Sequence, residues 1–129
     1  MPNFHQHAII NALAVAAIEV VKQRHDQARN PAQKFDWSRF IVSVGAGTLA
    51  GALPDILEPS LGNPNHRGFC HSLTAAILAW WLTSGRHTQN LPVEIRRCLA
   101  AMSAGYTLHL GADLFFTKAK GMGFIHARF

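Results

Sequence analysis

The chain has 129 residues, a length that supports one folded domain and leaves no room for a second. Twelve Lys and Arg against seven Asp and Glu give a formal net charge of +5. Because 49% of the residues are hydrophobic and only 15% are charged, a disordered basic tail is excluded. The positive charge is compatible with a nucleic acid, an anionic membrane surface or a phosphorylated substrate. We expect a single domain over residues 1–129.

The cysteines and the N-terminus indicate a cytoplasmic setting. Cys70 and Cys98 lie in apolar runs and form neither a CxxC motif nor a disulfide framework, which is typical of a reducing compartment. The apolar run near the N-terminus contains Glu19 and has no basic leader, so we expect no secretory signal.

Three stretches contain no Asp, Glu, Lys or Arg, namely residues 40–53, 69–85 and 98–112. Each is shorter than the ~20 residues of a membrane-spanning helix, which favours buried core helices. Trp80 and Trp81 form a pair that is suited to a headgroup layer. The location that we expect is therefore cytoplasmic, with peripheral contact to the anionic inner face of the cytoplasmic membrane as the alternative.

The apolar periodicity predicts an all-α bundle of four main helices, with no alternating pattern typical of strands. A long connection over residues 54–68 separates the second and third helices, and ordered loops of this length tend to be functional. Gly45, Gly47 and Gly51 would allow a neighbouring helix to approach the second helix closely. The expected helices run from about Phe4 to Gln27, from a cap at Asp36 or Ser38 to Pro54, from Phe69 to Thr83, and from Pro92 to Phe116.

His109 and Asp113 carry the strongest chemical signal in the chain. They are four residues apart in an apolar helical segment, so both side chains leave the same helix face. A carboxylate in such a segment is costly unless it is paired or bound to a cation. Two interpretations follow, a buried hydrogen-bonded pair or part of a metal site.

Further metal-ligating residues surround the long loop. His66 lies in the loop and His71 in the first turn of the next helix, and flexible backbone at Gly68 would let both imidazoles converge. Asp55 follows the proline at the end of the second helix, and His7 lies near the start of the first helix.

Together these residues predict a metal centre. Mixed imidazole and carboxylate ligands suit zinc, with Mn, Fe or Ni as alternatives, and six candidates are enough for one or two ions. The other four histidines have polar or terminal contexts, and we expect them at the surface. The candidate ligands are His7, Asp55, His66, His71, His109 and Asp113; the surface histidines are His5, His25, His87 and His126.

The segments GALPDILEP, HRGFCHSL and GYTLHLGADLF resemble the signature blocks of the YdjM-like family of inner-membrane-associated, metal-dependent hydrolase-like proteins. These blocks are a Leu-Pro-Asp, a His-Arg-Gly-x-x-His-Ser and a Gly-Tyr-x-x-His-x-x-x-Asp, in this order after an early helix that bears a His. The resemblance covers His7 to about Phe116. It implies metal-binding roles for His7, Asp55, His66 or His71, His109 and Asp113.

One departure from the family affects the catalytic hypothesis. Relatives commonly continue Pro-Asp-Ile-Asp-His, and this chain keeps the first Asp as Asp55 but has Leu57 and Glu58 at the next two positions. Any role of the missing Asp and His therefore passes to Glu58 or is absent. The leading hypothesis is hydrolysis of a small-molecule or lipid phosphoester. In it, a metal-bound water is the nucleophile, Asp55 or Glu58 accepts the proton, and a second metal or Arg67 stabilises the oxyanion.

Two other functions compete with hydrolysis. A structural metal could tie the helices together in a membrane-associated or partner-binding protein; such a centre would be closed, whereas a catalytic one keeps an open position. Nucleic-acid binding is the weakest hypothesis, because the Lys and Arg residues are scattered and do not gather on one helix face.

Overall fold

The structure is a computed structural model that describes residues 4–57 and 69–116, and every regular element in these ranges is helical. The expected all-α architecture is therefore confirmed. The elements are α1 (Phe4–Arg29), α2 (Trp37–Leu57), the short 3₁₀ helix η1 (Phe69–His71), α3 (Leu73–Thr83), α4 (Gly85–Thr88) and α5 (Val93–Phe116).

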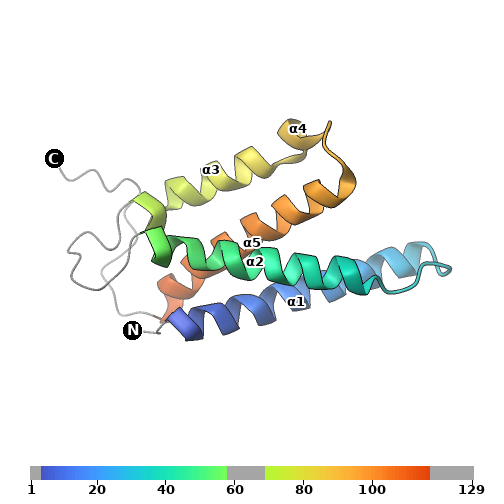
Figure 1. Cartoon of the computed structure of the whole chain (residues 1–129), viewed down its shortest axis with the longest axis horizontal. Helices are drawn as coiled ribbons and strands as arrows, with labels where there is room; N and C mark the ends of the chain where they lie inside the picture. Colours follow the sequence, from blue (N-terminus) through green and yellow to red (C-terminus); the bar gives the residue numbers. More distant parts are fainter. Residues whose placement is uncertain (1–3, 58–68, 117–129) are drawn as a thin grey trace.

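The α2 helix packs against both α1 and α5, and it passes in front of α5 in Figure 1. Its most extensive packing is against α5, followed by α1, while α3 packs mainly on α5. Both α2 and α5 run toward the end of the bundle where α1 and η1 begin. The end of α2, the end of α5 and the short η1 are therefore brought together at one end of the molecule.

The second helix extends further than the sequence suggested. We expected it to end near Pro54, but α2 continues through this proline to Leu57. A proline inside a helix removes one backbone hydrogen bond, and here the loss is offset by packing, because Pro54 is among the most completely buried side chains. Asp55 consequently lies in the last turn of α2 and not in a loop.

Close approach of α2 and α5 depends on glycine. A Cβ atom added at Gly105 would overlap the carbonyl oxygen of Gly47 and would lie 2.5 Å from its carbonyl carbon. A Cβ at Gly51 would meet the side-chain amide of Asn11 and would lie 3.0 Å from the carbonyl oxygen of Gly105. The expectation of close packing is confirmed at Gly47 and Gly51, whereas Gly45 is exposed, with nothing within 4 Å of an added Cβ.

The interior contains mainly small and polar side chains, while many large apolar side chains face outward. Among the described residues the buried apolar set consists of six alanines with Val15 and Leu110. Leu13, Ile41 and Leu49 are 65–71% exposed. We expected the three uncharged stretches to be buried core helices. This is wrong for many side chains of residues 40–53 and 69–85, whereas residues 98–112 are mostly buried or half-buried. Small residues between helices with large apolar residues outside are typical of helices in lipid.

A polar network holds the opposite end of α1 and α2. The Arg39 guanidinium forms an ion pair with Glu19 at 2.5 Å and donates a hydrogen bond to Asp26 at 2.8 Å. The Gln23 side chain accepts a hydrogen bond from the backbone N–H of Asp36 and donates one to its carbonyl oxygen. The Asp36 carboxylate accepts a hydrogen bond from the N–H of Arg39, so of the two expected caps, Asp36 and Ser38, it is Asp36 that caps α2.

Candidate metal centre

Four side chains of types that can bind a metal meet at one end of the bundle, and they come from three elements. Asp55 comes from the last turn of α2, His71 from the end of η1, and His109 and Asp113 from successive turns of α5. The sequence separates Asp55 from His109 by more than fifty residues, and the packing of α2 on α5 brings them together.

Local hydrogen bonds fix the position of His71. The next residue, Ser72, caps α3 by accepting a hydrogen bond from the N–H of Ala75, and its hydroxyl donates to the carbonyl oxygen of Phe69. The Tyr106 hydroxyl donates to the carbonyl oxygen of Cys70 at 2.5 Å. Because Tyr106 lies one turn before His109 on α5, this bond ties η1 to the helix that supplies two of the four side chains.

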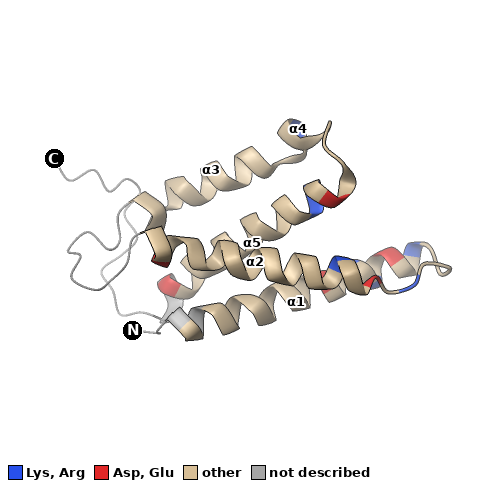
Figure 2. Ribbon diagram, in the orientation of Figure 1, with Lys and Arg blue, Asp and Glu red and all other residues tan. Residues whose placement is uncertain are grey.

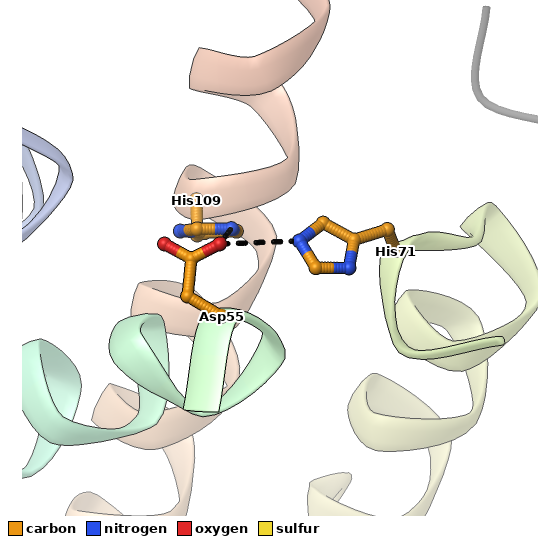
Figure 3. A group of neighbouring side chains, drawn as sticks. All are labelled: Asp55, His71 and His109. Atoms are coloured by element: carbon orange, nitrogen blue, oxygen red, sulfur yellow. Dashed lines mark hydrogen bonds and ion pairs between the residues drawn. The ribbon is translucent and has the colours of Figure 1, made fainter. Parts of the chain in front are cut away.

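The nitrogen and oxygen atoms of the cluster are close together, and Figure 3 shows the side chains of Asp55, His71 and His109. The Nε2 atom of His71 lies 3.4 Å from an Asp55 oxygen and 3.8 Å from an Asp113 oxygen. The Nε2 atom of His109 lies 3.7 Å from the same Asp55 oxygen and 3.6 Å from the Asp113 oxygen. The two imidazole rings are 5.5 Å apart between centroids. Each imidazole is therefore aimed at both carboxylates.

Burial differs among the four side chains. Those of His109 and His71 are 0% and 1% exposed, and that of Asp113 is 7% exposed, whereas the Asp55 side chain is 19% exposed. Two carboxylates at a nearly buried position require compensating positive charge. Asp55 forms the more accessible side of the cluster.

This donor set fits a divalent transition metal. Nitrogen and oxygen ligands lie 2.0–2.2 Å from zinc, so two ligands of a tetrahedral site are roughly 3.4 Å apart. The observed separations of 3.4–3.8 Å are near this value and longer than good hydrogen bonds. Asp55, His71 and His109 each offer a ligand atom within 4.8 Å of the others. Imidazole with carboxylate is also the mixture that zinc, manganese, iron and nickel accept.

Four of the six ligands predicted from the sequence are thus neighbours in the structure. The backbone of His7 lies in α1, but its side chain is outside the described part of the chain, as is all of His66. Glu58 and Arg67, the other two predicted catalytic residues, also fall outside the described residues. Of the predicted surface histidines, His5, His25 and His87 are exposed, and His126 is not among the described residues.

Sequence reasoning missed the residues that position the ligands. Tyr106 and Ser72 belong to the motif segments, but they were given no role. The sequence did contain one indication of such a role: Tyr106 is the single tyrosine of the chain, and its hydroxyl needs a hydrogen-bond partner within an apolar helix. Asn11 of α1 was also given no role; it is fully buried against Gly51, and its amide has no hydrogen-bond partner within the described ranges.

Comparison with known proteins identifies a family. The model of a family described as "YdjM inner membrane protein" matches residues 1–124, nearly the whole chain. No curated protein matches the chain. No solved structure matches it. Within residues 4–57 and 69–116, the helix Trp37–Leu57 is long and apolar enough to cross a membrane, and 33% of its most apolar window is buried.

Proposed function

This chain belongs to the YdjM inner membrane protein family, and we propose that it is a metal-dependent hydrolase acting on a phosphoester. The proposal rests on one observation above all: His71 and His109 both aim Nε2 at Asp55 and Asp113 over 3.4–3.8 Å. Zinc is the metal that we favour for this centre, with Mn, Fe or Ni as alternatives and one or two ions per chain.

A bound metal would supply a water of lowered pKa and a positive charge opposite the developing oxyanion. His71 and His109 would hold the metal together with the carboxylates of Asp55 and Asp113. Asp55 is the most accessible of the four, which suits it to accept a proton from a water that enters from the open side. In this proposal Arg67 binds the phosphoryl oxygens, and Glu58 is a second acid.

A structural metal is the second candidate function. The observation that favours it is the burial of His71 and His109 at 1% and 0% exposure, since structural centres are closed. The centre would then hold α2, η1 and α5 together without taking part in a reaction. The accessible Asp55 is the feature that argues for catalysis instead.

Metal content tests the binding step shared by both candidates. Purified protein should carry roughly one to two transition-metal ions per chain by elemental analysis. His109→Ala and Asp113→Ala should both lower this content because they share one centre, and His87→Ala, an exposed histidine of α4, is the control that should not. If the first two substitutions destabilise the protein with its metal content unchanged, the pair is a hydrogen-bonded core pair and the proposal is wrong.

Hydrolysis distinguishes the two candidates. Metal-loaded protein should hydrolyse at least one substrate in a panel of phosphomonoesters and phosphodiesters, including phospholipids. Arg67→Ala and Glu58→Gln should reduce turnover with metal content and melting temperature nearly unchanged. Metal-loaded protein that fails on the whole panel would favour the structural centre, and equal activity in all three proteins would remove Arg67 and Glu58 from the mechanism.

A further inference from the structure

The charged residues are distributed unevenly along the bundle. All eight Lys and Arg of the described ranges lie toward the end where α1 finishes and α2 and α5 begin (Figure 2). The candidate metal centre lies at the opposite end, with Asp55 and Asp113 as its charged side chains. We call the first end the basic end; its residues are Lys22, Arg24, Arg29, Lys34, Arg39, Arg86, Arg96 and Arg97.

An uncharged belt separates the two ends. Residues 40–57 of α2 contain one charged residue, Asp55, and residues 98–116 of α5 also contain one, Asp113; both belong to the cluster at the site. In α1 the single charged residue between positions 4 and 21 is Glu19, which is buried in its ion pair with Arg39. Each of these segments is about 18 residues long and covers roughly 27 Å, close to the ~30 Å hydrocarbon core of a bilayer.

The tryptophans mark the boundary between this belt and the basic end. Trp37 begins α2, and Trp80 and Trp81 lie in the last turn of α3, so all three are near the basic end. They are 67%, 67% and 50% exposed. Exposed tryptophan at the edge of an apolar belt is typical of the membrane interface, where the indole ring lies at headgroup level.

A cavity at the same level adds charge complementarity to anionic lipid. Its volume is about 300 Å³, and its lining includes Lys22, Arg39, Arg96 and Arg97, with Glu19 as the one acidic residue. Because Arg39 already pairs with Glu19, three cations of the lining are left to attract an anion. Basic pockets between helices at the cytoplasmic side of a membrane suit phospholipid headgroups.

We propose that the basic end lies in the anionic headgroups of the cytoplasmic leaflet, so that the candidate metal centre opens on the periplasmic side. Lys and Arg are retained on the cytoplasmic side of inner-membrane proteins, and this bias sets their orientation. The other four Lys and Arg of the chain are outside the described ranges. Even if all four are counted with the end that holds the candidate metal centre, the basic end has eight Lys and Arg against four. This orientation replaces the cytoplasmic location that we expected from the cysteines and the N-terminus.

Accessibility of single cysteines in intact cells tests the orientation. In a Cys70→Ser, Cys98→Ser background, Gln33→Cys reports on the basic end, because Gln33 is exposed in the loop between α1 and α2 and its replacement leaves every Lys and Arg in place. Leu57→Cys reports on the other end, since Leu57 is the exposed last residue of α2. A membrane-impermeant maleimide is applied to spheroplasts and then to lysed membranes.

The impermeant reagent should label Leu57→Cys in intact spheroplasts and Gln33→Cys only after lysis. The reverse pattern, labelling of both only after lysis, or recovery of the protein from cells without detergent would overturn the proposal. If the thiol introduced by Leu57→Cys does not react even in detergent, Phe69→Cys takes its place as the reporter. Phe69 is also exposed and lies at the end of the bundle with the candidate metal centre. Because the inference depends on the membrane location and charge distribution, its failure would leave metal binding and hydrolysis unaffected.

Discussion

Replacing Gly105 with alanine should separate α2 from α5 and destabilise the protein. The added Cβ would overlap the carbonyl oxygen of Gly47 and would lie 2.5 and 2.8 Å from its carbonyl carbon and Cα. All three atoms belong to the backbone, so no side-chain rotation relieves the overlap and the two helices must move apart. Overpacking of this kind costs ~1–3 kcal/mol, and we expect the upper part of this range because backbone meets backbone.

The opposing effect is helix propensity, which favours alanine over glycine by ~1 kcal/mol in a helix interior. The net change expected for Gly105→Ala is therefore a loss of ~2 kcal/mol in the free energy of unfolding. Gly45→Ala is the matched control: Gly45 lies in α2, and an added Cβ there would have nothing within 4 Å. That substitution should raise stability by up to ~1 kcal/mol, so the two variants should differ by ~3 kcal/mol.

The assay is thermal unfolding of the detergent-solubilised protein, followed by circular dichroism, with metal content measured on the same samples. Gly105→Ala should lower the melting temperature by several degrees. It should also lower metal affinity, because Asp55 follows Gly47 by two turns of α2 while His109 follows Gly105 by one turn of α5. Gly105→Ala with wild-type stability, or an equal effect of both alanine substitutions, would refute the inference that glycine sets the distance between these helices.

Two further predictions concern individual hydrogen bonds. Tyr106→Phe removes the hydrogen bond to the Cys70 carbonyl oxygen, so it should weaken metal binding and lower the free energy of unfolding by ~1 kcal/mol. Unchanged zinc affinity in a titration would show that other contacts hold η1 in place. The hydrogen bond from Arg39 lowers the pKa of Asp26 below its ordinary value of 3.8. The ionised Asp26 carboxylate therefore stabilises the folded protein above pH 3.8, and this contribution is lost as the pH falls through the lowered pKa. The melting temperatures of wild type and Asp26→Asn should differ near neutral pH and converge in acid.

The sequence by itself determined the helical architecture and most of the recognisable chemistry. Periodicity and turn residues located the main helices to within a few residues, because a helix buries or exposes its side chains at a fixed local spacing. The pairing of His109 and Asp113 on one helix face follows from the same spacing. The proline at position 54 predicted the end of the second helix, but α2 continues to Leu57 because packing of Pro54 against its neighbours offsets the loss of one backbone hydrogen bond.

Only the tertiary structure decided which side of each helix faces its neighbours and which faces outward. In the sequence, charged residues such as Glu19 and Asp113 limit the length of each uncharged stretch. In the structure both side chains are buried inside the bundle, so the uncharged outer surface is longer than the sequence indicated. The convergence of Asp55 and His71 on His109 likewise depends on the contact of α2 with α5 and on the bond between Tyr106 and η1. Such contacts join residues far apart in the chain, and local periodicity contains no information about them.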